Sequence, residues 1–302
     1  MSAEALDIDQ GKSLRGEMAS ARRRRTLKFV RELADHPSFL IGATILAILT
    51  LIAVLAPWIA PYDPNKNNYR DVLMGPSSQF WFGTDGYGRD ILSRVIYGLR
   101  VSLMIGLLVA ILTGIFGTIL GTAASYVRWL DGLLMRTLDG LMAFPGVLLA
   151  IALASALGPS EMTVIIALTV TYTPRTARVV RAAVLVVQGM QYVEAAKAVG
   201  AGHGRIIFRY ILGNALSPLI VQMTFVFAVS IIAEAIMSFL GVGPPPPAPS
   251  LGNIIADGRT YIQEAWWVAV FPGIVIAVAV LGLNLMGDGL RDIIDPRHRS
   301  ER

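Results

Sequence analysis

Residues with the types and spacing that catalysis requires are scarce in this sequence of 302 residues. It has no cysteine, and its histidines, His36, His203 and His298, all lie outside the apolar runs. A metal site or an intramembrane protease would need ligands or a serine and histidine pair within those runs. The stretch that comes nearest to a phosphate loop, Gly11 to Ser13, has Leu6 where the leading glycine belongs. We therefore expect no catalytic residue, no metal and no cofactor on this chain.

Glu234 is the charge that stands out, because it lies in the middle of the apolar stretch SIIAEAIMSFL. A carboxylate that faces lipid is costly, so such residues usually face a cavity or another helix. Glu234 is a candidate residue of a substrate pathway, and equally a packing residue held by hydrogen bonds between helices. The sequence leaves both interpretations open.

The most informative segment runs from Glu194 to Pro218, EAAKAVGAGHGRIIFRYILGNALSP. Its start favours a helix up to Val199, three glycines then interrupt it, and helical propensity resumes from Arg205 to Leu212. We expect two short helices, joined by a sharp glycine turn, that lie across the mouth of a helix bundle.

The composition of this segment suits contact with another protein. Ala195, Ala196 and Ala198 give the first helix a thin side that fits a groove, and Glu194 and Lys197 add charged contacts. The alternative is an amphipathic loop that lies at the membrane interface without a protein partner.

The composition and the apolar runs of the chain predict that membrane-spanning helices position Glu234 and the segment from Glu194. Hydrophobic residues make up 54% of the chain and charged residues only 16%, whereas soluble domains carry about 25% charged residues. Hydrocarbon offers backbone N–H and C=O groups no partner, so crossing a core about 30 Å thick takes roughly 20 apolar residues in a helix. Five runs have this length: Ser38–Ala60, Val101–Tyr126, Leu138–Leu157, Ala215–Leu240 and Ala265–Met286.

A sixth run, Met162 to Pro174, is short by itself. Arg175, Arg178 and Arg181 follow it at helical spacing. Such side chains can reach the interface while the helix continues, so we count this run as a span. The sequence therefore predicts an all-α integral membrane protein with about six transmembrane helices.

The basic residues predict the orientation of these spans. Lys and Arg number 20 on the side of the termini and 6 on the other side. The positive-inside rule therefore places both termini in the cytoplasm, and it accounts for the net charge of +5 without a nucleic acid partner. We expect a cytoplasmic tail over residues 1–37, with Arg22 to Arg25 as an orientation signal, a membrane domain over 38–290 and a second tail over 291–302.

Small residues and prolines mark positions of close packing or bending. Gly117 and Gly121 form a GxxxG face, which allows two helices to approach closely. Pro145 and Pro272, each within Phe-Pro-Gly, are expected to kink their helices. Arg89–Tyr97 has the pattern of a short amphipathic helix that leads into the second span.

The segment from Glu194 resembles the EAA loop of ABC importer permeases, in which Glu-Ala-Ala is followed four residues later by glycine. Here these residues are Glu194, Ala195, Ala196 and Gly200, within a loop over residues 190–214. Three further stretches resemble the DppC/OppC-like permeases of dipeptide and oligopeptide importers: Gly83–Leu103, Ser238–Ile255 and Phe271–Arg297. The sequence differs from the family pattern at Gly202, where a serine is common, and in Tyr210–Gly213, where His-Ile-Leu-Pro is common.

This resemblance implies the type I ABC importer permease fold and a transport subunit that hydrolyses nothing itself. In the family the loop is a coupling helix that docks in a cleft of the ATPase subunit. The residues of this sequence that the resemblance assigns to docking are Glu194, Ala195, Ala196, Lys197, Gly200, Arg205 and Arg209.

The resemblance also implies partners and a location. The partners are a second, similar permease, two ATPase domains that bind ATP and Mg²⁺, and an extracytoplasmic peptide-binding protein, all at a bacterial cytoplasmic membrane. The implied cargo is a dipeptide or oligopeptide, although relatives of similar sequence carry nickel, glutathione or other small solutes. An ion-driven secondary carrier is the alternative from another class, and it would need intramembrane carboxylates that bind ions.

Overall fold

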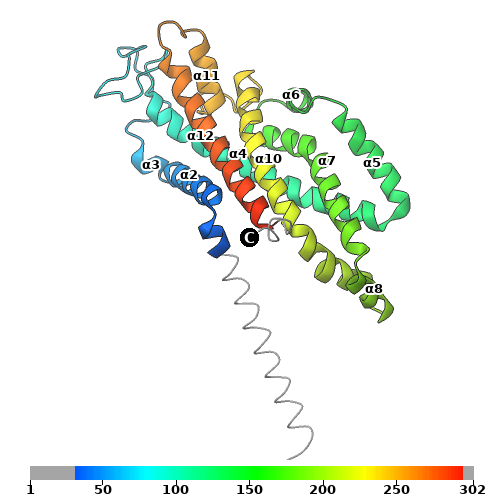
Figure 1. Ribbon diagram of the computed structural model, residues 1–302. Coiled ribbons are helices and arrows are strands. Elements are labelled where there is room, and N and C mark those ends of the chain that lie inside the picture. Colours follow the sequence, from blue (N-terminus) through cyan, green and yellow to red (C-terminus); the bar gives the residue numbers. More distant parts are fainter. Residues whose placement is uncertain (1–30, 295–302) are drawn as a thin grey trace, which may run out of the picture.

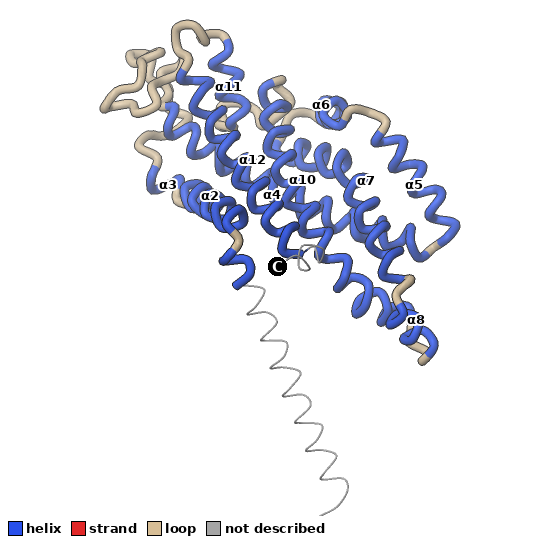
Figure 2. The backbone as a smooth tube through the Cα atoms, in the orientation of Figure 1, coloured by secondary structure: helices blue, strands red, loops and turns tan. Residues whose placement is uncertain are grey.

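The computed structural model describes residues 31–294, and in that range it consists of helices, turns and one isolated bridge between Thr84 and Asp90 (Figure 1; Figure 2). Arg22 to Arg25 lie outside the described residues. The helices are α2 Pro37–Val54, α3 Ala56–Ile59, α4 Ile91–Tyr126, α5 Arg128–Met142, α6 Gly146–Leu157, α7 Glu161–Gln188, α8 Gln191–Ala198, α9 His203–Arg205, the π-helical turn η1 Ile206–Ile211, α10 Leu212–Phe239, α11 Leu251–Arg259 and α12 Trp267–Ile294.

The long helices lie beside one another in an order that differs from their order in the chain. Figure 1 shows α2 beside α12, α12 beside α10, and α7 and α5 beyond α10. The helix α4 has 36 residues and packs against both α7 and α10. α4 therefore joins the two halves of the bundle.

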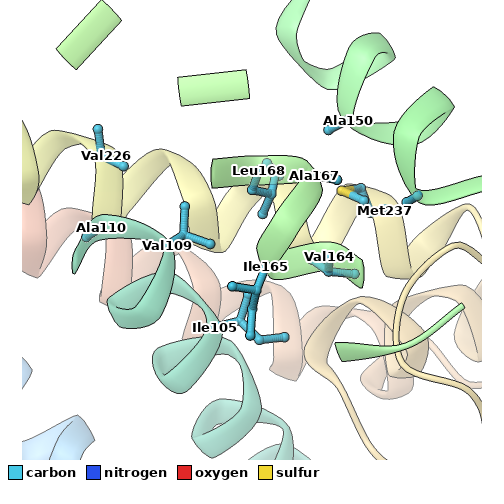
Figure 3. Packing of buried hydrophobic residues seen from close by; sticks show 12 residues of the cluster. Ile105, Val109, Ala110, Ala150, Val164, Ile165, Ala167, Leu168, Val226 and Met237 are labelled. Carbon is cyan, nitrogen blue, oxygen red and sulfur yellow. The ribbon is translucent and has the colours of Figure 1, made fainter. Parts of the chain in front are cut away.

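Two clusters of buried apolar side chains hold these helices together. The first joins α4, α6, α7 and α10 and includes Ile105, Leu168 and Met237 (Figure 3). The second joins α2, α4, α10 and α12 and includes Leu103 and Leu283. Many other large apolar side chains stay on the outside, as expected of a protein whose surroundings are lipid.

The predicted GxxxG face is confirmed, and it faces α7. A Cβ atom added at Gly117 would lie 2.5 Å from Cγ2 of Thr176, and one added at Gly121 would lie 2.5 Å from the carbonyl oxygen of Ala177. Only glycine allows the two helices to come this close.

Within residues 31–294, four helices are long and apolar enough to cross a membrane: α2, α4, the helix His203–Phe239 and α12. α5 and α6 would count as a fifth only together, and they meet at an angle of 91°. The run Leu138–Leu157, expected as one span with a kink at Pro145, is divided at that position into α5 and α6, so the expected kink is a complete break of the helix. α5 ends before Phe144 because Pro145 lacks an N–H and disfavours helical geometry in the residue before it. Pro272, by contrast, lies inside α12.

α7 is the helix expected from the short sixth run, and its 28 residues would extend over about 42 Å. Two of its arginines pair with α5 rather than extending to an interface. Arg178 forms an ion pair with Asp139, and Arg181 donates two hydrogen bonds to Asp131, at 2.6 and 2.7 Å. Ion pairs therefore hold α5 against α7.

Residues 61–90 and α11 form a cap over the N-terminal ends of α4 and α12. Within it Arg89 donates to Asp85 at 2.6 Å and to Asp257 at 2.9 Å, and the buried Arg94 lies 3.7 Å from Asp85. Burial raises the pKa of the Asp257 carboxyl, while the charges of Arg94 and Arg89 oppose that rise. The cap is thus held by charges that are largely withdrawn from water.

The amphipathic helix expected over Arg89–Tyr97 is not a separate element. α4 begins at Ile91, and the carboxylate of Asp90 caps it by accepting a hydrogen bond from the N–H of Ser93 at 2.8 Å. The amphipathic stretch is therefore the first part of α4, which continues without a break to Tyr126.

We expect Gly121→Ala to lower the stability of the protein. The added methyl overlaps the carbonyl oxygen of Ala177, so α4 and α7 must move apart, at a cost of about 1 to 3 kcal/mol for overpacking. Thermal unfolding of the detergent-solubilised protein should show a Tm lower by several degrees. Gly132→Ala is the matched control, because its Cβ in α5 meets no atom within 4 Å and alanine favours a helix. Equal Tm values for the two variants would contradict the close contact.

Candidate functional site

α8 opens the segment between α7 and α10. Its one buried residue is Val193, which packs with Val184 of α7 and Ile206 of η1. The remaining α8 side chains are exposed or half-buried. α8 therefore sits on the C-terminal end of α7 with most of its surface free.

The turn after α8 depends on Gly200, which has a φ of 85°. Its N–H donates to the carbonyl of Lys197 at 2.9 Å, and the N–H of Ala201 donates to the carbonyl of Ala196 at 3.0 Å. These two bonds form a Schellman motif, in which the residue after the helix is left-handed and favours glycine. The predicted glycine turn is confirmed at this position.

The other two glycines do not break the helix that follows. Gly202 is the N-cap of α9, and Gly204 lies inside it. From His203 one helix continues through η1 and α10 to Phe239, a length of 37 residues. The separate short helix expected over Arg205–Leu212 is therefore wrong, because buried isoleucines of η1 pack against α7 and offset the low helical propensity of glycine.

The structure brings the predicted docking residues together on α8, the turn and the helix that follows. They are Glu194, Ala195, Ala196 and Lys197 on α8, Gly200 in the turn, and Arg205 and Arg209 beyond it. All are exposed except Ala196, which is half-buried. Within residues 31–294 none of their charged groups forms an ion pair, so these charges are available to another molecule.

Two exposed apolar residues of this segment were missed in the sequence. Val199 is 88% exposed and Phe208 is 77% exposed. Large apolar side chains on a projecting loop are typical of protein interfaces, where aromatic residues are enriched. The sequence signal that would have found them is a valine and a phenylalanine among small and charged residues.

A hydrogen bond ties α8 to the base of α10. Asn214 donates from Nδ2 to the hydroxyl of Tyr192 at 3.0 Å, and the rings of Tyr192 and Tyr210 lie 6.1 Å apart. α8, the turn and the start of α10 are thus connected as one structural unit.

Glu234 lies further along α10 and is fully buried. Its carboxylate accepts hydrogen bonds from Ser102 of α4 at 2.6 Å and from Ser238 at 2.7 Å. This arrangement agrees with the packing interpretation, while a role in a pathway stays a prediction. The described part of the chain contains no group of three His, Cys, Asp or Glu residues that could hold a metal ion.

Two family models match this chain. Residues 89–300 match the model described as a binding-protein-dependent transport system inner membrane component. Residues 27–76 match the N-terminal TM domain of oligopeptide transport permease C.

Similar proteins and structures agree with these matches. A permease protein of Brucella abortus is 54% identical over 271 residues, which cover 90% of this chain and 92% of that protein. The dipeptide transport system permease protein DppC of Alkalihalophilus pseudofirmus is 42% identical over 271 residues, 89% of each chain. A chain of the MetNI methionine ABC transporter in an inward-facing conformation has a TM-score of 0.52 at 20% identity, covering 68% of this chain and 98% of that one. The structural similarity supports the expected permease fold.

We expect Gly200→Ala to loosen the end of α8. Alanine in the left-handed region costs about 1 kcal/mol, so the two Schellman bonds should open roughly five times more often. Hydrogen exchange of the Gly200 position and Ala201 amides should accelerate by that factor. Gly204→Ala is the control, because this position is helical and its Cβ meets nothing within 4 Å. Equal exchange rates in both variants would contradict the structural role of the turn.

Proposed function

We infer the function of this chain from its family, because the chain belongs to the inner membrane components of binding-protein-dependent transport systems. It is a multi-pass membrane permease subunit of an ABC importer. We propose that its cargo is a dipeptide or short oligopeptide. The support is the match of residues 27–76 to oligopeptide permeases and the similarity to the dipeptide transport permease described above.

The observation that carries the proposed mechanism is the exposed surface of α8 and its turn. Charged residues that form no ion pair within the described part of the chain project from the bundle, together with the apolar Val199 and Phe208. The sequence has no phosphate loop of its own. In the proposal this surface docks on a partner ATPase subunit, which binds ATP and Mg²⁺ and supplies the energy, while this chain catalyses no reaction.

The proposed cycle is alternating access between this chain and a second, similar permease in a bacterial cytoplasmic membrane. Both termini and α8 face the cytoplasm, and an extracytoplasmic binding protein delivers the peptide on the other side. ATP can drive such a cycle only if it favours one conformation by a difference in binding free energy. α8 transmits that difference from the two ATPase domains to the helix His203–Phe239.

Other cargoes fit the same fold. Nickel chelates, glutathione and other small solutes would require the same loop and the same bundle, and they differ from peptides in what the binding protein delivers. An ion-driven carrier, the alternative from another class, has no use for an ATPase-docking surface. Membership of a binding-protein-dependent family also argues against it.

Uptake into proteoliposomes tests the proposed cargo. They would contain this chain with its co-purified permease and ATPase partners and the matching binding protein. We expect ATP-dependent uptake of a labelled dipeptide, with competition by unlabelled peptides. ATPase stimulation by the loaded binding protein without any peptide uptake would reject the peptide cargo and keep the permease assignment.

We expect Glu194→Arg to separate ATP hydrolysis from transport. Reversing the charge on the docking surface should reduce ATP-dependent uptake at least tenfold, since about 1.4 kcal/mol of lost contact free energy corresponds to a factor of ten. Uptake and ATPase activity would be measured on the same proteoliposomes. Asp35→Arg makes the same charge change on an exposed residue outside the loop and should leave uptake intact. Normal uptake by Glu194→Arg would count against docking at α8.

A further inference from the structure

One face of α2 carries an apolar stripe that continues beyond the end of the helix. Ile48, Leu51 and Val54 are each more than half exposed, and their spacing places them on one helical face. Trp58 of α3 follows Val54 at the same spacing and is 77% exposed. Because α2 is long and apolar enough to span the membrane, this face meets lipid, and the stripe extends the lipid-facing surface as far as Trp58.

Trp58 lies at the level where the hydrocarbon ends. From Pro37, where α2 begins, to Trp58 the chain rises about 32 Å at 1.5 Å per residue. The hydrocarbon core is about 30 Å thick, so a helix that enters it near Pro37 leaves it near Trp58. Asp35 and His36 stand just before α2, and α3 ends at Ile59, where the chain passes into the cap.

A second exposed indole belongs to a tight turn of the cap. Trp81 is 68% exposed, whereas its neighbour Phe80 is 4% exposed. The carbonyl of Phe80 accepts two hydrogen bonds, from the N–H of Ser77 at 2.8 Å and from the N–H of Gly83 at 3.0 Å. The turn therefore presents the indole of Trp81 from a fixed backbone.

Aromatic contacts fix the level of this turn. The ring of Phe80 lies 5.3 Å from that of Tyr62, just after α3, and the hydroxyl of Tyr62 donates to the carbonyl of Gln79 at 3.3 Å. On the other side Phe82 stacks on Phe271, in the first turns of α12, with ring centres 4.0 Å apart. The turn is thus held between the end of α3 and the start of α12, so both exposed indoles lie where these helices meet the membrane surface.

Neither exposed indole has a partner that explains its place. Within residues 31–294 the N–H groups of Trp58 and Trp81 donate no hydrogen bond, and their rings lie against no other aromatic ring. The buried Trp267 of the same end, by contrast, donates to the carbonyl of Thr84 at 3.1 Å. An indole combines an apolar ring with one polar N–H, and tryptophan is enriched where hydrocarbon gives way to headgroups.

We propose that the cap is anchored to the bilayer by Trp58 and Trp81, which insert together into the headgroup layer on the side opposite α8 (Figure 1). The partner is phospholipid: its ester and phosphate oxygens accept the indole N–H groups, while the rings lie against the tops of the acyl chains. In the proposed orientation this is the extracytoplasmic leaflet. One face of the cap is thereby closed to an extracytoplasmic binding protein, which has to approach from another side.

Spin labels measure this depth directly, because the chain has no cysteine that competes for the label. Trp58→Cys and Trp81→Cys would carry a nitroxide in the importer assembled with cysteine-free partners, in vesicles of phosphatidylethanolamine and phosphatidylglycerol. Oxygen concentrates in lipid and a nickel chelate stays in water, so the ratio of their collision rates reports depth. We expect both labels to give ratios between that of Leu51→Cys, on the lipid-facing stripe, and that of Lys66→Cys, an exposed charged position of the cap.

A conservative variant provides a second measurement if a cysteine variant does not assemble. Trp81→Phe keeps an aromatic ring, and the fluorescence that it loses relative to the unaltered chain is the emission of Trp81. Phospholipid brominated near the top of its acyl chains should quench this emission several-fold more than phospholipid brominated near the chain ends, and iodide in the water should quench it least. Trp267→Phe is the matched control, since the emission of this buried indole should respond little to all three quenchers.

Two outcomes would overturn the proposal. A collision ratio for Trp81→Cys equal to that of Lys66→Cys, or iodide as the strongest quencher of Trp81, would place the turn in water. Low collision rates with both oxygen and the nickel chelate would place it beneath another protein chain, such as the binding protein or the second permease. Depth is measured from the nearer bilayer surface, so neither outcome depends on the cargo or the orientation, which the uptake experiment tests separately.

Discussion

The contact between α4 and α7 determines where α8 and the turn that follows it can lie. Lipid gives helices no hydrophobic reason to associate, so close van der Waals contact must hold them. Gly117 and Gly121 bring the two backbones together, and the last turns of α7 then carry the valines on which α8 rests. The angle and height of α8 therefore follow from two residues that have no side chain.

The sequence predicted the positions of the helices because hydrocarbon imposes a length and a composition on every span. It did not predict their direction. The run Leu138–Leu157 is apolar apart from Asp139, yet the chain turns by 91° within it, and only Pro145 carried a signal of that turn. Gly200, Gly202 and Gly204 looked equivalent in the sequence, but only Gly200 has a positive φ. The glycines behave differently because the isoleucines after the turn are buried against another helix. This packing belongs to the tertiary structure and cannot be seen in the sequence.

Charged residues show the same limit for the candidate site. The loop residues were found because their pattern is local. Arg175, Arg178 and Arg181 share one spacing, and their partners come from other helices that the sequence does not identify. Glu234 accepts a hydrogen bond from a serine 132 positions away, so its burial followed from packing that no local pattern records. The sequence drew attention to these residues by their type. It could not assign their roles, because each role depends on a partner that is distant in the chain.

The helix His203–Phe239 is continuous, and this gives it the properties of a lever arm. It extends over about 55 Å at 1.5 Å per residue, with both of its irregularities, the π-helical turn and Pro218, near the end that carries the loop. A tilt of about 5° around that end would displace the far end by about 5 Å, close to the pitch of one helical turn. A small change of angle at the base of this helix therefore gives a larger displacement at its far end. The stiffness of the regular part of the helix decides how much of that displacement reaches the far end.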